Sequence, residues 1–379
     1  MVYSTILFDI DGVMLSEERY FDASALTVYE MLCSDDWLGL RVDGLPDFTV
    51  QPDDEHIQHI RSTVFANDAV LDTMKSAGVN ANWDMVYLQF MYQWYRLLRE
   101  VSISKPHWRQ VRDALDESWG HESIRAVGSI LREHGCSIQP ESFAAFSQRF
   151  GDCADRAAMF TKIEQWFAEL FESEGQLADD LQTVYDLGVD VFQAWYLGDE
   201  YSAGPAVGKH GFVQQEIPLA APESLAALFE LCTKTGATLG VATGRPQIET
   251  EVPFHVYGWE RHFPKNRITT ASDVRQTEQR YPHLRPLSKP HPFSYVRSWL
   301  GTNAESALAQ TLPLPTEVGQ SILIVGDSVA DWKAARSMGC HFAAVLTGLT
   351  GAQARQTFEQ LGCEYILNNV LDLAQALHL

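Results

Sequence analysis

The stretch TILFDIDGV, residues 5–13, is an apolar run of strand length that ends in two aspartates, Asp9 and Asp11, followed at once by Gly12. Continuous apolar runs are typical of strands that are buried on both faces of a parallel sheet. Similar runs occur much later in the chain, at residues 238–242, 322–325 and 342–346. Helical patterns alternate with them from about residue 216 onward. The sequence therefore predicts an α/β fold with a doubly wound, mostly parallel sheet.

The long stretch between the first run and its expected sheet partners has a different pattern. It contains long amphipathic segments, such as WDMVYLQFMYQWYRLL from Trp83 onward, and hardly any strand-like run. We therefore predict a large all-helical domain over residues 16–215, inserted into an α/β core formed by residues 1–15 and 216–379. The glycine-rich segment GPAVGKHG, residues 204–211, is expected to be the linker that returns to the core.

The composition limits the classes of function. The chain has 379 residues, of which 46% are hydrophobic, enough to form two hydrophobic cores. Its 50 acidic and 28 basic residues give a formal net charge of −22. This charge opposes binding to nucleic acid and to anionic membranes. An anionic substrate must therefore be held by a few local cations or by a metal ion.

The cysteines and the N-terminus bear on the cellular location. The six cysteines are scattered and form no CxxC pair, so the sequence predicts neither a zinc site nor a disulfide framework. The first apolar stretch has no basic region before it, and no uncharged apolar run of about 18 residues occurs. We expect a soluble cytoplasmic protein, and the sequence leaves its oligomeric state open.

A later apolar run also ends in carboxylates. In ILIVGDSVADW, Asp327 follows the run and Gly326, and Asp331 comes four residues later, on the first turn of a helix expected to start near Ser328. Because parallel strands end at the same crevice, we expect Asp9, Asp11 and both later aspartates to lie together. Mg²⁺ prefers such oxygens together with substrate phosphate. Two alternatives stay open here: a solvated acidic loop at Asp9, and helix N-capping by Asp327.

Two further features lie where an anionic substrate would need them. Thr243 ends another strand-like run in LGVATGRP, where its hydroxyl and the Gly244 amide could donate hydrogen bonds to an oxyanion. Lys289 in LSKPHPF would add a cation near the carboxylates. Taken singly, each has an ordinary explanation, since a threonine at a strand end is usually structural and a lone lysine is usually solvated.

In their order along the chain, DIDGV at 9–13, VATGR around Thr243, SKPHP around Lys289 and GDSVAD at 326–331 resemble the four motifs of the haloacid dehalogenase-like hydrolase superfamily. The resemblance covers residues 1–15 and 216–379, and the inserted domain has the position of a C1-type cap. It is strongest for the phosphoglycolate phosphatase and β-phosphoglucomutase-like branch, whose third motif often reads KPxP. The insertion here is much larger than the usual cap of that branch.

The resemblance implies roles for the first aspartate pair. It makes Asp9 the nucleophile that attacks phosphorus and forms an aspartyl-phosphate. Asp11 would protonate the leaving oxygen and then activate water. Members of the superfamily that attack carbon lack this second aspartate, so the presence of Asp11 favours phosphoryl transfer.

The resemblance also implies a metal and phosphate site. Mg²⁺ would be held by the Asp9 carboxylate, the Asp11 backbone carbonyl and Asp327, with Asp331 acting on a metal-bound water or on Lys289. The transferring phosphoryl group would be held by Thr243, the Gly244 amide and Lys289.

The implied activity is Mg²⁺-dependent hydrolysis of a small phosphorylated metabolite. A phosphomutase and a phosphonatase remain alternatives within the superfamily, although no cap lysine for a phosphonatase imine can be identified. A non-catalytic binding or regulatory protein is the alternative of another class. The cap residues expected to contact substrate lie near its two junctions with the core: Arg19, Tyr20, Lys209 and His210. The segment Arg275 to Leu287 lengthens the spacing between the second and third motifs, and we expect it to be an additional loop.

Overall fold

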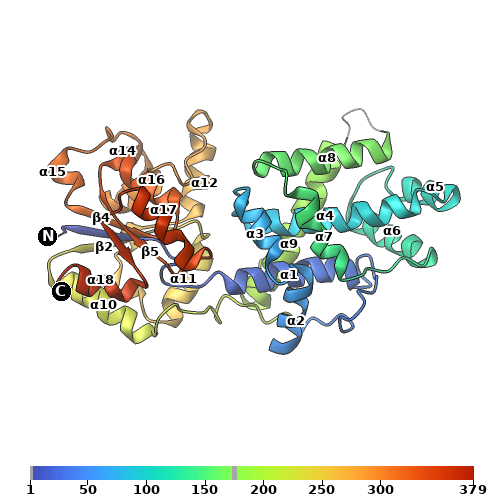
Figure 1. Ribbon diagram of the computed structural model, residues 1–379, viewed down its shortest axis with the longest axis horizontal. Helices are drawn as coiled ribbons and strands as arrows, with labels where there is room; N and C mark the ends of the chain where they lie inside the picture. Colours follow the sequence, from blue (N-terminus) through green and yellow to red (C-terminus); the bar gives the residue numbers. More distant parts are fainter. Residues whose placement is uncertain (1–2, 173–176) are drawn as a thin grey trace. The chain divides into compact units, whose positions relative to one another are not determined.

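The computed structural model describes residues 3–172 and 177–379. The chain divides into two compact units. One, the core unit, combines Met1–Arg19 with Val213–Leu379, and the other, the helical unit, is Tyr20–Phe212 (Figure 1). These divisions fall within a few residues of positions 15 and 215, at which the sequence analysis places the domain junctions.

The core unit is built on a six-stranded parallel sheet in the order β3-β2-β1-β4-β5-β6. Its strands are β1 (Thr5–Phe8), β2 (Thr238–Ala242), β3 (Ile268–Thr269), β4 (Ile322–Gly326), β5 (His341–Val345) and β6 (Tyr365–Leu367). The α/β class with a doubly wound parallel sheet is therefore confirmed. The fourth predicted run is shifted, because β5 starts and ends one residue earlier than 342–346.

The first strand lies in the middle of the sheet. Phe8, the last residue of β1, is in register with Val241 of β2 and Val325 of β4. The carboxyl ends of β1, β2 and β4 therefore lie side by side. This is the edge at which open α/β sheets bind their ligands.

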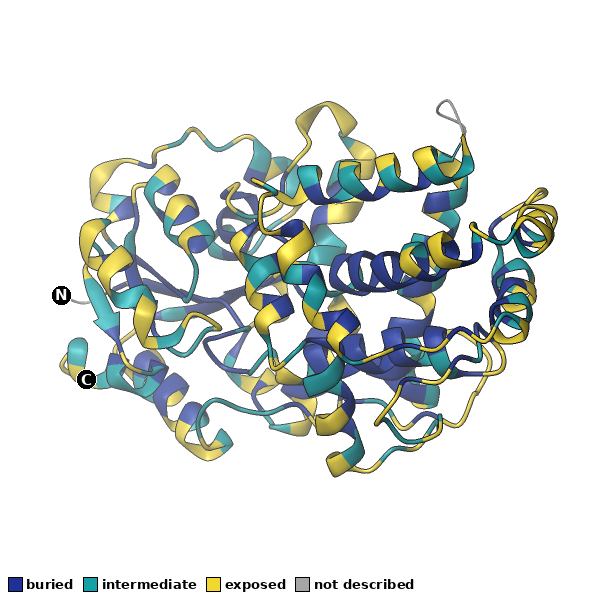
Figure 2. Ribbon diagram, turned by 45° about the vertical axis from the view of Figure 1, so that its right-hand side comes forward, coloured by how far each residue is buried: buried dark blue, intermediate teal, exposed yellow. Residues whose placement is uncertain are grey.

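Both faces of the sheet are covered, which explains the continuous apolar runs. On one face, Ile6 and Phe8 belong to a cluster with residues of α10 (Pro222–Lys234) and α18 (Leu373–Ala376). On the other, Leu7 belongs to a cluster with residues of α13 (Phe293–Leu300) and α16 (Val329–Met338). Figure 2 shows the strands largely in the colour of buried residues.

The rest of the core unit consists of short helices. The α-helices are α11 (Gln247–Val256), α12 (Ala271–Arg280), α14 (Ala304–Leu308), α15 (Thr316–Gly319) and α17 (Ala354–Gln360), and the 3-10 helices are η1 (Glu260–His262), η2 (Lys265–Arg267), η3 (Pro282–Leu284), η4 (Gly351–Gln353) and η5 (Val370–Asp372). The expectation of an additional loop over 275–287 is largely wrong. A capping box between Thr270 and Asp273 starts α12, which includes the first part of this segment, and η3 forms its middle.

The helical unit contains no β-strand among its described residues. Its helices are α1 (Glu18–Cys33), α2 (Asp54–Val64), α3 (Ala69–Ser76), α4 (Asn82–Val101), α5 (Lys105–Ala114), α6 (His121–Glu133), α7 (Glu141–Phe150), α8 (Arg156–Phe171) and α9 (Ala178–Tyr201). The aromatic helix α4 is central to the unit, and its Trp94 is fully buried against Trp119 and Phe167. Within the described part of the chain, no helix combines the length and the apolar character that crossing a membrane requires.

Candidate active site

Asp9 directly follows the last residue of β1 and lies at the edge of the sheet where the strands end. Its N–H donates to the carbonyl of Val325 on β4, at 2.9 Å, so the backbone pairing of β1 continues to this residue. The chain then turns sharply at Gly12, whose φ of +69° lies in the left-handed region that favours glycine. The first motif therefore combines a strand end with a tight turn.

Asp327 follows the last residue of β4 and is enclosed by two glycines. A Cβ atom added to Gly12 would lie 2.2 Å from Asp327 Oδ2, and one added to Gly348 would lie 1.9 Å from it. The hydroxyl of Thr347 donates to the carbonyl of Gly12 and ties the two glycine segments together. Only backbone without side chains leaves room for this carboxylate.

Asp331 is buried in the first turn of α16, where two side-chain hydroxyls donate to its carboxylate. Ser328 is the N-cap of the helix, and its hydroxyl donates to Asp331 Oδ2 at 2.6 Å. The hydroxyl of Tyr295 donates to Oδ1 at 2.7 Å. The N-cap is thus Ser328 and not Asp327, so the capping explanation of Asp327 is wrong.

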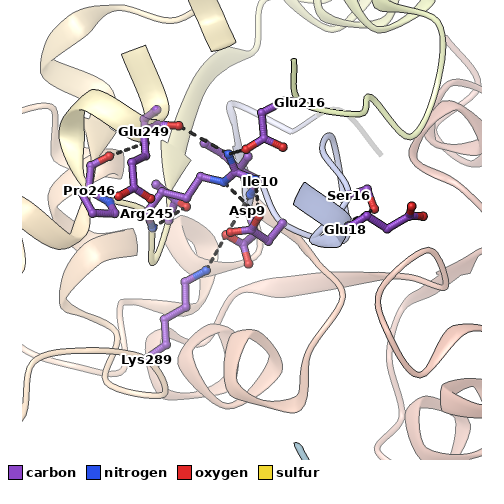
Figure 3. A network of polar contacts seen from close by, with 12 residues as sticks. Asp9, Ile10, Ser16, Glu18, Glu216, Arg245, Pro246, Glu249 and Lys289 are labelled. Atoms are coloured by element: carbon purple, nitrogen blue, oxygen red, sulfur yellow. Dashed lines mark hydrogen bonds and ion pairs between the residues drawn. The ribbon is translucent and has the colours of Figure 1, made fainter. Parts of the chain in front are cut away.

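Lys289 joins the two aspartate motifs. Its Nζ lies 2.8 Å from Asp9 Oδ1 and 2.8 Å from Asp331 Oδ1, and its side chain is 15% exposed. The ammonium group also lies 5.1 Å from the centre of the Tyr295 ring. Figure 3 shows Lys289 extended toward Asp9. This nearly buried lysine is the local cation that an acidic chain needs to hold an anion.

The three carboxylates form one group. Ligand atoms of Asp9, Asp327 and Asp331 all lie within 4.8 Å of one another. Burial raises the pKa of Asp9 to about 7, although Lys289 opposes the shift. Burial, together with the charges of Asp331 and Asp9, raises the pKa of Asp327 well above its ordinary value. Burial acts upward on Asp331 as well, but Lys289 and the hydrogen bonds bring its pKa below the ordinary value.

This group fits a divalent cation. Without a cation, Asp9 and Asp327 are held where ionisation is unfavourable, because the buried Asp9 and the partly buried Asp327 both lie beside other carboxylates. Oxygen donors of this kind suit Mg²⁺, and the two glycines around Asp327 keep its carboxylate inside the group. The residues present are therefore those that could hold the metal that the sequence analysis expects.

Thr243 and Gly244 lie at the neighbouring end of β2. Thr243 is 2% exposed, and its N–H donates to the carbonyl of Thr269 at 3.0 Å. Its hydroxyl oxygen accepts from the Arg245 N–H at 3.1 Å, which leaves the hydroxyl proton available. A Cβ at Gly244 would meet nothing within 4 Å. The open backbone at Gly244 and the Thr243 hydroxyl are compatible with binding an oxyanion.

The side chain of Asp11 does not join the carboxylate group and is held by Arg245 instead. Arg245 Nε and Nη2 donate to Asp11 Oδ1 at 2.9 and 2.6 Å, and Nη1 donates to Glu216 Oε1 at 2.6 Å. Figure 3 shows Arg245 reaching both the first motif and Glu216. The sequence analysis misses this arginine and its partner. The available signal is that Arg245 directly follows Thr243 and Gly244 in VATGRP.

The family model described as HAD-hydrolase-like matches residues 287–373, which include Lys289, Asp327 and Asp331. Over these residues the chain is similar to the haloacid dehalogenase-like (HAD-like) hydrolases. None of the curated proteins compared with it matches.

Solved structures also resemble this chain. An X-ray structure of Northeast Structural Genomics Consortium target ZR25 is 31% identical, with a TM-score of 0.84 over 99% of this chain and 98% of the other. A HAD phosphatase from Thermococcus onnurineus is 14% identical, with a TM-score of 0.40 over 99% and 97%. A HAD-superfamily hydrolase, subfamily IA, variant 1, from Geobacter sulfurreducens PCA is 14% identical, with a TM-score of 0.39 over 99% and 96%.

Two of the four predicted cap contacts, Tyr20 and Lys209, make side-chain contacts inside the helical unit. Tyr20 is 5% exposed and stacks on Tyr196, with ring centres 4.4 Å apart. Lys209 is 4% exposed, and its Nζ lies 2.6 Å from Glu30 Oε2. These contacts give both residues a structural role in the helical unit, and a contact of either residue with substrate stays a prediction.

The other two predicted cap contacts, Arg19 and His210, are not buried. Arg19 belongs to the core unit, where its Nε donates to the carbonyl of Gln215 at 3.1 Å. His210 is exposed. The role of either residue in binding substrate stays a prediction.

Replacing Gly348 with alanine tests the enclosure of Asp327. The new Cβ would lie 1.9 Å from Asp327 Oδ2, so the carboxylate must move. We expect a loss of about 1–3 kcal/mol in the free energy of unfolding. We also expect Mg²⁺ to bind at least about tenfold more weakly, because a ligand is displaced. Thermal unfolding with a titration of Mg²⁺ measures both effects.

Gly204→Ala is the matched control, because a Cβ there would lie 3.6 Å from its nearest neighbour, the Ser202 hydroxyl. It should leave both quantities unchanged. An unchanged Mg²⁺ titration in Gly348→Ala would contradict the enclosure of Asp327.

Proposed function

We propose that this protein is a HAD-like hydrolase and a Mg²⁺-dependent phosphatase that acts on a small phosphorylated metabolite. The observation that supports this proposal most is the set of contacts that the Asp9 carboxylate makes. Lys289 Nζ and the Ile10 N–H, each 2.8 Å away, both contact Asp9 Oδ1. Within the described residues, Oδ2 has no hydrogen-bond partner. The carboxylate is thus oriented by one oxygen while the other is left for a new partner, as a nucleophile requires.

In this proposal, Asp9 attacks phosphorus, the bond to the leaving oxygen breaks, and an aspartyl-phosphate forms. Asp11 donates a proton to the leaving oxygen and then takes one from the water that hydrolyses the intermediate. Thr243, the Gly244 amide and Lys289 hold the phosphoryl oxygens.

The metal would be held by the carboxylates of Asp9 and Asp327 and by the backbone carbonyl of Asp11. When bound, Mg²⁺ supplies positive charge beside the phosphoryl oxygens. Asp331 has a different part, because its contacts with Lys289, Tyr295 and Ser328 make it the residue that fixes the lysine. The proposal also gives the helical unit the role of a C1-type cap, since it is inserted directly after the first motif.

The experiment that tests the proposal is hydrolysis of 4-nitrophenyl phosphate, followed by a screen of phosphorylated metabolites for phosphate release. Activity should require Mg²⁺ and should disappear when EDTA is in excess. A mutase would transfer phosphoryl groups between sugar phosphates faster than it releases phosphate. A protein that shows neither reaction in the presence of Mg²⁺ would contradict the proposed function.

Binding of Mg²⁺ is also expected without any substrate. Mg²⁺ should raise the melting temperature of the wild-type protein, because a ligand that binds only the folded state stabilises it. The rise should be absent in Asp327→Asn, which removes a carboxylate ligand. Glu359→Gln, which changes an exposed carboxylate of α17, is the control and should keep the full rise. An equal rise in Asp327→Asn would show that the ion binds elsewhere.

A further inference from the structure

Arg245 has no assigned part in the proposed reaction, although it contacts Asp11 directly. It is 1% exposed and lies between two carboxylates, those of Asp11 and Glu216. We propose that Arg245, anchored by Glu216, is a positioning residue that holds Asp11 for proton transfer to the leaving oxygen. The inference rests on the proposed function and adds to it.

The contacts leave Asp11 with one held and one available oxygen. Arg245 Nε and Nη2 both donate to Oδ1. Oδ2 accepts no hydrogen bond from the described residues, and the Asp11 side chain is 27% exposed. A fork of two donors on one oxygen restricts rotation of the carboxylate more than a single donor would. Oδ2 is therefore the oxygen that is available to contact the leaving oxygen of a substrate.

Glu216 explains how the guanidinium itself is held. Its side chain is fully buried, and its Oε1 lies 2.6 Å from Arg245 Nη1. Arg245 Nη1 also donates to the carbonyl of Glu249 at 3.4 Å. With Nε and Nη2 on Asp11 and Nη1 on Glu216, the planar fork is fixed at both ends. It cannot turn without breaking a buried ion pair.

Glu216 lies in a chain segment that is hydrogen-bonded to the residues just after the turn that carries Asp11. The N–H of Ser16 donates to the carbonyl of Ile217 at 2.8 Å, and the N–H of Leu219 donates to the carbonyl of Met14 at 2.9 Å. The segment that contains Glu216 is thus paired with the chain just after the first motif. Arg245 therefore joins the side chains of Asp11 and Glu216, and backbone hydrogen bonds hold the segments next to these two residues together.

A role in binding phosphate fits Arg245 less well. An arginine that binds a substrate phosphate needs accessible donors, whereas this side chain is 1% exposed and its donors contact protein acceptors. The competing explanation is that Arg245 only stabilises the fold. The two explanations differ in what they predict for substrates with different leaving groups.

The test compares kcat/KM for phenyl phosphate and 4-nitrophenyl phosphate. Phenolate is the poorer leaving group, so its departure depends more on a proton from Asp11. Arg245→Lys keeps the charge but replaces the fork with one ammonium group, which cannot reproduce both contacts. We expect kcat/KM to fall roughly tenfold more for phenyl phosphate than for 4-nitrophenyl phosphate. Glu216→Gln, which weakens the ion pair that holds Arg245, should also lower kcat/KM more for phenyl phosphate than for 4-nitrophenyl phosphate, but by a smaller factor.

Arg336→Lys is the matched control, because Arg336 also forms a two-donor ion pair, with Glu364 in the core unit. It should not lower kcat/KM for one of the two substrates more than for the other. Equal losses for both substrates, or no loss, in Arg245→Lys would overturn the proposal. If that variant does not fold, Glu216→Gln decides by the same criterion, and its melting temperature shows that the comparison is made on folded protein.

Asp11→Asn separates this inference from the proposed function. A selective loss of phenyl phosphate activity in Asp11→Asn, but not in Arg245→Lys or Glu216→Gln, would overturn only the role of Arg245. The absence of a selective loss in Asp11→Asn itself would overturn the assignment of Asp11 as the proton donor, and the role of Arg245 with it.

Discussion

Asp9→Asn is expected to reduce phosphate release from aryl phosphates by about three orders of magnitude or more. The amide is a poor nucleophile and cannot form the aspartyl-phosphate. Its size matches the carboxylate, so Lys289 and the neighbouring strands should keep their places. Release of phosphate from 4-nitrophenyl phosphate with Mg²⁺ measures the effect. Phosphate trapped on the protein by acid quenching should appear in the wild type and be missing in the variant.

The fold of this variant should be intact, and pH gives a specific check. Burial raises the pKa of Asp9 to about 7 in the folded protein, so the folded state holds this proton more tightly than the unfolded state. The contribution of Asp9 to the free energy of unfolding therefore declines as pH rises from its unfolded pKa toward 7. Asparagine removes that decline, so at pH 8, without metal, the variant should be at least as stable as the wild type.

Asp54→Asn, at an exposed position in α2, is the control and should change neither activity nor stability. Substantial activity in Asp9→Asn would exclude Asp9 as the nucleophile.

The position of the carboxylate group could be predicted because it depends on strand ends. Apolar runs end just before Asp9 and Asp327, and parallel strands bring such ends to one edge of the sheet. Asp331 follows because a helix start brings it back toward Asp327. Lys289 was inferred from the charge that an anion site requires, and the structure places it 2.8 Å from Asp9.

The remaining contacts depend on tertiary packing that sequence patterns do not encode. Asp11 and Arg245 are far apart in sequence, and nothing in either motif indicates that their side chains meet. The fit of Gly348 against Asp327 is equally nonlocal. Tyr20 was expected near substrate because it lies at a domain junction, but its ring is buried against Tyr196. Position along the chain carries no information on the direction of a side chain.

Lys289→Met is expected to cause a large loss of both activity and stability. The lysine is the cation between two buried carboxylates, those of Asp9 and Asp331. Removing one partner of a buried ion pair typically costs about 3–5 kcal/mol, because the other charge is left uncompensated. Activity should fall by at least about 10²-fold, since the phosphoryl group loses a charged donor.

The loss of stability in Lys289→Met should depend on pH in a defined direction. In the wild type, Lys289 and the hydrogen bonds hold the pKa of Asp331 below its ordinary value, and this contributes stability above the unfolded pKa. Without the lysine, burial raises the pKa, and Asp331 binds a proton on folding at low pH. The difference from wild type should therefore be larger at pH 8 than at pH 5.

Urea unfolding at the two pH values, without metal, measures the difference. Lys333→Met is the matched control, because it removes an exposed lysine from α16, the helix that carries Asp331. It should leave stability nearly unchanged at both pH values. If the loss of stability in Lys289→Met did not depend on pH, the lysine would contribute through packing, for example against the Tyr295 ring. That result would contradict a contribution through the charge that the lysine places beside Asp331.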